Sequence, residues 1–285
     1  MISILLCTYN GGVYLSEQLD SLLNQTFTDY QVFIHDDGST DETINIIQSY
    51  CNRYSNIHYL EDNVKHRGAR HSFMWLLENV DSKYYMFCDQ DDVWLPNKLE
   101  LMYGAIKKAE LTSDKNKPVL VHSDMKIVDR NLNVISNSLY RTMRIIPRVV
   151  DNSFNFMGVC SCGPGCSMIF NNVAKLCALS YDDLTVIPMH DWWIAINTIK
   201  HGKVKFLDMP TMLYRQHDNN TVGASDVTGS YMLKKLRQLR KTLSQYSEEI
   251  SWLKKVNYGG ILKYLYFKFL YSIIRLVVKF GKYEN

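Results

Sequence analysis

The stretch that decides the fold is residues 84–92, which read YYMFCDQDD. Five apolar residues are followed at once by three aspartates within four positions, as at the end of a buried strand. Two earlier segments repeat the pattern: residues 2–7 run into Thr8–Gly12, and residues 31–35 run into Asp36–Ser39. Strands that end in polar loops, with helical patterns between them, predict a parallel sheet whose loops converge on one edge.

Strand and helix signals alternate over the first hundred residues and become less regular afterwards. Helices are predicted over 14–23, after Ser39 or Thr40, over 72–80 and after Pro96, with a further strand at 57–60. Later elements are strands at 119–124 and 126–134, a strand after the Gly- and Cys-rich loop 158–170, a helix at 190–200, and one or two strands within 204–216. We therefore expect an α/β fold with one mixed, mainly parallel sheet flanked by helices over residues 1–229, followed by a tail over 230–285.

Charge is unevenly distributed along the chain. The net charge is only +3, yet residues 230–285 carry nine Lys and three Arg against three Glu. The preceding residues are therefore acidic overall, which suggests that body and tail have separate tasks. Nucleic-acid binding fits poorly, because the body is acidic and no recognition module is visible.

Seven cysteines form no even disulfide framework, and residues 1–4 read as a strand rather than a signal peptide. A reducing cytoplasm is the expected location. Cys160, Cys162 and Cys166 do not match a common zinc spacing, and we interpret them as small residues in a tight Gly-Pro-Gly turn.

The acidic loop at 89–92 is the sharpest chemical signal. Carboxylates at positions i and i+2 on a turning loop, here Asp89 and Asp91, can face one hard cation such as Mg²⁺. A diphosphate leaving group needs such an ion, because charge builds on its oxygens as the bond breaks. The alternative is a solvated acidic turn before the helix that Pro96 opens. An ordinary Asp-Gly turn is likewise an alternative for Asp36–Ser39.

The order of these loops resembles family 2 glycosyltransferases with the Rossmann-like GT-A fold, over about residues 1–220. The Asp-Gln-Asp-Asp-Val-Trp form at 89–94 is similar to bacterial rhamnosyltransferases and related cell-surface polysaccharide enzymes. The resemblance implies an inverting, metal-dependent enzyme with Mg²⁺ or Mn²⁺ that moves rhamnose or another hexose. It also implies a dTDP- or UDP-sugar donor, a saccharide or polyprenyl-linked acceptor, a nucleotide-sugar-binding half at 1–117 and an acceptor half at 118–229.

The resemblance also assigns roles to individual residues. Those expected to bind the nucleotide sugar are Thr8, Tyr9, Asn10, Asp37, Asp89 and Gln90. Arg70 is added because it falls where a basic residue could approach the diphosphate, although no fixed motif places it. Those expected at the metal are Asp89, Asp91 and His217. The expected general base is Asp191, which must lie within about 3 Å of the acceptor hydroxyl. Trp192 and Trp193 are expected to stack on acceptor sugars, although core packing is an alternative for one of them.

The tail contains two amphipathic helical patterns, over 231–246 and 261–280. The second is long and apolar but includes four Lys or Arg, each costing roughly 2.5–3.5 kcal/mol at a bilayer centre. We therefore expect helices lying on an anionic membrane surface, so that the protein is peripheral on the inner face of the plasma membrane. A helical appendage packed on the body or on a second subunit, as in a homo-oligomer, is the alternative.

Two other functions share part of this pattern. A metal-dependent nucleotidyltransferase would share the sheet and the acidic loop, but it is expected to carry a basic, Gly-rich phosphate loop, and Thr8–Gly12 has no basic residue. A catalytically inactive membrane scaffold need not keep the acidic residues. The presence of Asp37, Asp89, Asp91 and Asp191 together argues against it.

Overall fold

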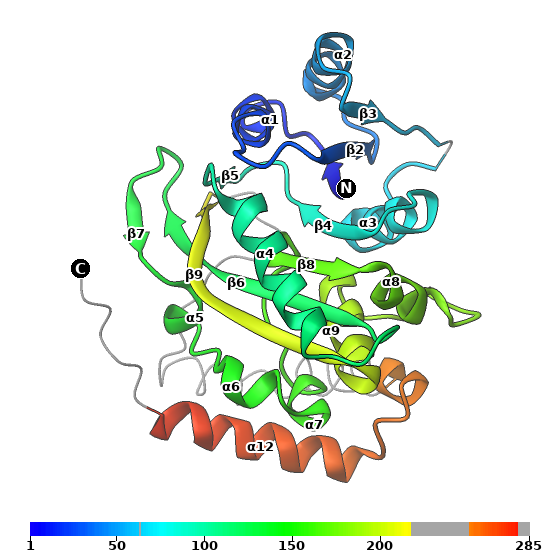
Figure 1. The fold of residues 1–285 in the computed structure, drawn as a ribbon, viewed down its shortest axis with the longest axis vertical. Coiled ribbons are helices and arrows are strands. Elements are labelled where there is room, and N and C mark those ends of the chain that lie inside the picture. The colour runs from blue at the N-terminus through cyan, green and yellow to red at the C-terminus, as the bar shows by residue number, and fades with distance from the viewer. Residues whose placement is uncertain (63, 218–250, 279–285) are drawn as a thin grey trace.

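The structure is a computed structural model that describes residues 1–62, 64–217 and 251–278. Its described part holds one nine-stranded sheet in the order β3-β2-β1-β4-β8-β6-β9-β5, with β7 paired to β6 (Figure 1). The strands are β1 Ile2–Thr8, β2 Tyr30–Asp36, β3 Ile57–Tyr59, β4 Tyr84–Cys88, β5 Val93–Trp94, β6 Val119–Val128, β7 Val134–Ser136, β8 Met168–Asn171 and β9 Lys203–Arg215.

The helices fall between and after these strands, as the apolar spacing predicted for the first hundred residues. The longer ones are α1 Leu15–Leu23, α2 Thr43–Arg53, α3 Gly68–Asn79, α4 Lys98–Leu111, α8 Asn172–Leu179, α9 His190–His201 and α12 Ile261–Val277. The short ones are α5 Leu139–Thr142, α6 Pro147–Val150, α7 Phe154–Met157 and the 3₁₀ turn η1 Gly165–Ser167.

Four strands form the parallel half of the sheet. β1 pairs in parallel with β2 and with β4, and β2 pairs in parallel with β3. The register places Thr8 beside Asp36 and Leu6 beside Cys88, so the three polar loops leave the sheet at one edge. The predicted convergence of these loops is therefore confirmed.

Helices cover both faces of this half, and the strand residues alternate between two buried clusters. Ile4 and Met86 pack in the cluster that includes α1 and α2, whereas Leu5 and Phe87 pack with α3 and α9. All four side chains are fully buried. Since successive side chains point to opposite faces, a strand buried on both faces must be apolar throughout, as residues 84–88 are.

The second half of the sheet is mixed. β8 is antiparallel to both β4 and β6, whereas β6 and β9 run parallel. One strand, Val119–Val128, replaces the two strands predicted at 119–124 and 126–134. Its register shifts at Asp124, whose carboxylate accepts the backbone N–H of Leu139 at 3.1 Å. The strand stops where Asp129 accepts N–H groups of a polar turn, including that of Asn133 at 2.9 Å.

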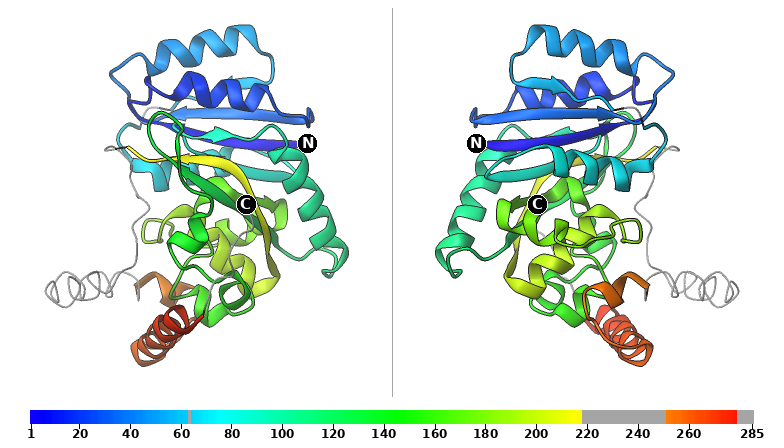
Figure 2. Two further views of the ribbon diagram at one scale, coloured as in Figure 1. Left: turned by 90° about the vertical axis from the view of Figure 1, so that its left-hand side faces the viewer. Right: turned by 90° about the vertical axis from the view of Figure 1, so that its right-hand side faces the viewer.

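The tail is only partly described. The predicted helix at 231–246 and the boundary predicted at 229/230 lie outside the described residues. Helix α12 is present and lies at the end of the molecule opposite α2 (Figures 1 and 2). Its Tyr264 and Tyr271 are buried in the α9 cluster. Among the described residues, no helix combines the length and apolar character that a bilayer crossing requires.

Candidate active site

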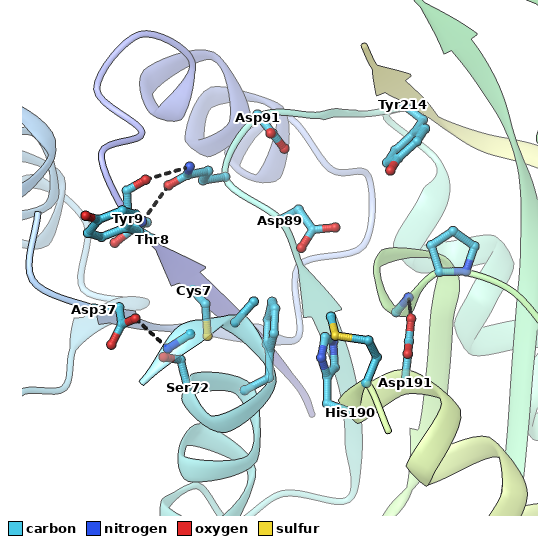
Figure 3. Close-up of a pocket in the computed structure, with 17 residues that line it drawn as sticks. Cys7, Thr8, Tyr9, Asp37, Ser72, Asp89, Asp91, His190, Asp191 and Tyr214 are labelled. Carbon is cyan, nitrogen blue, oxygen red and sulfur yellow. Dashed lines mark hydrogen bonds between the residues drawn. The ribbon is translucent and has the colours of Figure 1, made fainter. Parts of the chain in front are cut away.

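A cleft of about 390 Å³ lies at the carboxyl edge of the parallel strands (Figure 3). The ends of β1, β2 and β4, the first turns of α3 and α9, and the loop before η1 line it. A volume of this order is typical of small-molecule sites. The cleft brings together seven of the residues predicted from the sequence: Thr8, Tyr9, Asp37, Asp89, Gln90, Asp91 and Asp191.

The first and third polar loops are joined through Gln90. Its side-chain oxygen accepts the backbone N–H of Tyr9 at 2.9 Å, and its side-chain N–H donates to the Tyr9 carbonyl at 3.1 Å. Gly11 packs against the same side chain, since a Cβ atom at position 11 would lie 2.2 Å from the Gln90 Oε1 atom. A larger residue at position 11 would therefore have to displace the Gln90 amide from its two hydrogen bonds with Tyr9.

The second polar loop is held by its two aspartates. Asp36 accepts the Thr8 hydroxyl at 2.7 Å and the backbone N–H of Ser39 at 2.7 Å, so it supports the loop against the end of β1. Asp37 accepts two backbone N–H groups at the start of α3, both at 2.8 Å. Each carboxylate oxygen can accept a second hydrogen bond, so Asp37 can fix α3 and still meet a ligand in the cleft.

Asp89 and Asp91 repel one another within the cleft, and Figure 3 shows both carboxylates turned into it. Burial raises the pKa of Asp89 to about 7, and the Asp91 carboxylate contributes to this shift. The Oδ2 atom of Asp91 lies 2.8 Å from Nε2 of His217. Two carboxylates whose charge is poorly compensated form an oxygen donor set that fits Mg²⁺ or Mn²⁺.

A second polar cluster lies beside Asp89. It contains Asp92, Cys166 and Lys98, for which the sequence predicted no role in the site. One ligand atom each of Asp89, Asp92 and Cys166 lie within 4.8 Å of one another. Lys98 is fully buried and donates to the Cys166 carbonyl at 2.6 Å. Burial lowers the pKa of Lys98 to about 8, while the two aspartates oppose this shift. Because a thiol suits hard cations poorly and an ammonium is already present, we interpret this group as internal support.

The end of β9 holds the acidic loop in place through Arg215, which is buried. Its Nε atom donates to the carbonyl of Asp91 at 2.7 Å, and its guanidinium also donates to the Arg130 carbonyl and pairs with Glu17. The backbone N–H of Arg215 donates to Asp92 at 3.0 Å. Five donors in a planar group allow one side chain to join three separate segments.

Asp191 lies in the first turn of α9, and backbone N–H groups orient its carboxylate. Oδ2 accepts the N–H of Gly165 at 3.0 Å, and Oδ1 accepts that of Trp192 at 2.6 Å. Burial raises its pKa to about 6, so it remains mostly ionised at neutral pH. The neighbouring His190 stacks on Phe73 with ring centroids 4.1 Å apart, and burial lowers its pKa to about 3. His190 is therefore a neutral part of the cleft wall.

Comparison with known proteins identifies the family. The model described as "Glycosyl transferase family 2" matches residues 3–173, which include the ends of β1, β2 and β4. The chain belongs to glycosyltransferase family 2. Among its relatives is the dTDP-rhamnosyl transferase RfbG of Shigella flexneri, 28% identical over 230 residues, covering 77% of this chain and 74% of the relative. A glycosyltransferase of Rickettsia prowazekii, described as uncharacterized, is 31% identical over 140 residues, which cover 49% of this chain and 40% of the relative.

Solved structures give the fold of this family 2 glycosyltransferase. S. aureus TarS, residues 1–349, has a TM-score of 0.54 and 22% identity, over 75% of this chain and 60% of TarS. The mannosyltransferase PcManGT of Pyrobaculum calidifontis, in complex with GDP-Man and Mn²⁺, has a TM-score of 0.56 and 14% identity. The match covers 88% of this chain and 64% of PcManGT. The predicted GT-A fold is confirmed. The chain spans less than two thirds of each of these two proteins.

Five residues predicted for the glycosyltransferase site lie outside the cleft lining. One of them, His217, still contacts the cleft residue Asp91. The other four are Trp192, Trp193, Arg70 and Asn10. Trp193 is fully buried and donates its indole N–H to the Ala178 carbonyl, so its expected stacking on acceptor sugars is not supported and it is a core residue. The side chains of the other three form hydrogen bonds with backbone groups. Trp192 donates its indole N–H to the Met157 carbonyl at 2.6 Å, and Arg70 donates to the Ile187 carbonyl at 2.5 Å. The side-chain oxygen of Asn10 accepts the backbone N–H of Thr40 at 2.9 Å.

Proposed function

We propose that this glycosyltransferase moves a hexose, rhamnose first among the candidates, from a dTDP- or UDP-sugar to a saccharide acceptor with inversion of the anomeric carbon. The likeness to the rhamnosyl transferase of Shigella flexneri supports the sugar and the dTDP nucleotide. A relative in Bacillus subtilis, described as a putative teichuronic acid biosynthesis glycosyltransferase, supports a role in cell-surface polysaccharide synthesis. This relative is 35% identical over 102 residues, which cover 35% of this chain and 39% of the relative.

One observation carries the proposal. Four aspartates from separate loops, Asp37, Asp89, Asp91 and Asp191, share a cleft, and its described lining includes no Lys or Arg. An anionic diphosphate would be repelled by such a cleft unless a cation entered with it. Asp89 and Asp91 would hold Mg²⁺ or Mn²⁺, with His217 beside Asp91. When bound, the cation neutralises the charge that develops on the leaving diphosphate.

Asp191 is proposed as the general base. It accepts the proton of the acceptor hydroxyl as that oxygen attacks the anomeric carbon. The bond between this carbon and the diphosphate oxygen breaks on the opposite face, and the electron pair leaves with the nucleoside diphosphate. A pKa of about 6, raised by burial, makes Asp191 a stronger base than an ordinary aspartate and leaves it ionised at neutral pH.

The two halves of the sheet divide the substrates in this proposal. Residues 1–117 supply the donor side through Thr8, Tyr9, Asp37 and Gln90, whereas residues 118–229 supply the acceptor side. A lipid-linked, for example polyprenyl-linked, acceptor would be met at the inner face of the plasma membrane. The basic tail over 230–285 supports a peripheral association with anionic lipid there.

The test is a panel of nucleotide sugars incubated with the full chain and Mn²⁺, Mg²⁺ or a chelator. We expect metal-dependent release of one nucleoside diphosphate, together with a glycosylated acceptor of inverted configuration by NMR. Asp89→Asn should abolish release, and Asp182→Asn, an exposed aspartate outside the cleft, should not change it. Equal turnover in the chelator would remove the metal role, and release of inorganic diphosphate would indicate nucleotidyl transfer instead.

A further inference from the structure

Helix α12 presents a continuous apolar surface to solvent. Its exposed side chains are Ile261, Leu262, Leu265, Tyr266, Phe269, Ile273, Leu276 and Val277. Leu262 is 80% exposed and Phe269 67% exposed. Within α12, all of which the structure describes, each Lys and Arg is at least partly buried. A contiguous surface of this kind on a protein marks a place where another apolar body binds.

The charged residues of α12 face the other way. Lys268 donates to the Val159 carbonyl at 3.1 Å, and Arg275 donates from Nε to the Arg144 carbonyl at 3.1 Å. These bonds lie on the same side as the buried Tyr264. The basic side of α12 is therefore turned toward the body, and the apolar side faces outward.

The orientation of α12 is held by specific contacts with the body. Tyr271 is buried, and its hydroxyl accepts the backbone N–H of Ile146 at 3.2 Å. Arg144 in turn donates to the carbonyl of Arg275 at 3.1 Å. Rotating the helix to bury its apolar side would break these bonds and expose Tyr264 and Tyr271. The apolar side of α12 is therefore left uncovered by the described part of the chain.

Charge identifies the class of partner. Residues 251–278 contain five Lys or Arg and no acidic residue, and residues 231–246 contain five more basic residues and no acidic one. Each copy of this region carries a net positive charge, so the approach of a second copy of α12, or of the chain's own 231–246 segment, is opposed at long range even though Lys268 and Arg275 lie beside the body. An anionic bilayer offers an apolar interior beneath a negative surface, and both properties match this region.

We propose that α12 lies in the plane of an anionic membrane with its exposed apolar side inserted among the lipid acyl chains. Seventeen residues give a helix of about 25 Å, and insertion of such helices reaches about 5–10 Å into the headgroup boundary. Binding then comes mainly from apolar burial, with charge contributing attraction to the surface. The inference deepens the membrane association in the proposed function and does not depend on glycosyl transfer.

The experiment is vesicle flotation of the full chain with phosphatidylcholine alone and with an equal mixture of phosphatidylcholine and phosphatidylglycerol. The test variant is Leu262→Ser/Phe269→Ser/Leu276→Ser. The matched control, Leu111→Ser/Ile135→Ser/Leu176→Ser, changes three exposed apolar residues elsewhere. We expect the test variant to bind the mixed vesicles at least about tenfold more weakly and the control to bind as the unchanged chain does. In about 1 M salt, the unchanged chain should keep part of its binding, because screening leaves apolar insertion intact.

A second measurement locates the helix. Phe269→Trp fluorescence should be quenched by lipids with brominated acyl chains, whereas Leu111→Trp fluorescence should not. Equal quenching of the two, unchanged binding of the triple-serine variant, or complete loss of binding in high salt would overturn the proposal. So would a dimer that becomes monomeric on the triple substitution without vesicle binding by either form, because a second copy would then be the partner.

These outcomes are separate from those of the proposed activity. Flotation and quenching require neither donor nor acceptor, so an inactive protein still tests the membrane proposal. Stabilisation of the triple-serine variant by a nucleotide sugar in a thermal-shift assay shows that the fold is intact. Loss of that stabilisation in both variants would count against donor binding and not against α12.

Discussion

At the scale of the residue, Asp191 and Asp89 owe their altered acidity to different surroundings. Burial alone raises the pKa of Asp191 to about 6, and its carboxylate is oriented by backbone N–H groups. Asp89 reaches about 7 because the neighbouring Asp91 adds repulsion to burial. A bound cation would relieve that repulsion, so only Asp191 is expected to keep its raised pKa with a donor present.

Replacing Asp191 by Asn should reduce the transfer rate by about 10²–10⁴-fold and leave donor affinity nearly unchanged, because the amide cannot accept the proton. In the unchanged enzyme, kcat, which reports the substrate-bound complex, should rise with pH and level off above about pH 6, since protonation removes the base below its pKa. Initial rates between about pH 5 and pH 8 check this. A flat profile, or residual transfer with lost donor binding, would contradict the assignment.

Replacing Asp91 by Asn should abolish the Mn²⁺-dependent part of nucleoside diphosphate binding, because half of the carboxylate pair is removed. His217→Ala should weaken that binding by a smaller factor, since His217 contacts Asp91 at 2.8 Å through one hydrogen bond. Isothermal titration with and without Mn²⁺ measures both. Full Mn²⁺-dependent binding by Asp91→Asn would place the cation elsewhere.

At the scale of the element, the end of β9 holds the acidic loop at 89–92 through hydrogen bonds from Arg215. Arg215 joins that loop to α1 and to the turn after β6 through Asp91, Glu17 and Arg130. His217, two residues further, stacks on Tyr14 with ring centroids 4.9 Å apart. A strand from the second half of the sheet thus completes a site whose acids come mainly from the first half.

Replacing Arg215 by Met should lower the free energy of unfolding by about 2–4 kcal/mol, because the buried guanidinium's part-buried hydrogen bonds to the Asp91 and Arg130 carbonyls and its ion pair with Glu17 are lost together. It should also weaken Mn²⁺-dependent diphosphate binding, since the Asp91 backbone is no longer held. Arg215→Lys should recover little, because an ammonium cannot reproduce the planar donor group. Urea unfolding and Mn²⁺ titration measure these effects, with the exposed Arg53→Met as control. A fully stable Arg215→Met protein that lost only binding would contradict the supporting role.

The parallel half could be predicted from the sequence because its signals are local. Apolar runs such as residues 84–88 mark the strands, and the loops after them converge because parallel strands share an edge. Side chains whose position depends on distant segments could not be predicted. Lys98 lies in the first turn of α4, and lysine is ordinarily exposed, so only the packed fold shows its burial. For Trp193 the sequence leaves core packing open as an alternative to sugar stacking, and its complete burial in the fold decides between them.

At the scale of the whole molecule, α12 is part of the core and not a loose appendage. Tyr264 and Tyr271 are buried in the same cluster as Trp193 and Phe73. The alternative of a helix packed on the body therefore describes one side of α12, and the membrane proposal concerns the other. Deleting the tail would remove core residues as well, so point substitutions test the two sides more cleanly.

Replacing Tyr271 by Ala should reduce the free energy of unfolding by about 3 kcal/mol, because a buried aromatic side chain and its hydrogen bond are lost. Tyr266→Ala, at a position 60% exposed on the same helix, should change it by no more than about 0.5 kcal/mol. Thermal or urea unfolding distinguishes the two. Equal small effects would mean that α12 is not packed on the body in solution.

The buried tyrosines of α12 also restrict how the enzyme can sit on any surface. A helix fastened on one side to the rest of the protein is not a tether, so a bilayer that holds α12 sets the height and tilt of the cleft as well. An acceptor chain fixed in the same bilayer would have to span that height for its terminal hydroxyl to arrive. The enzyme would then select acceptors by the distance between their lipid anchor and their terminal hydroxyl.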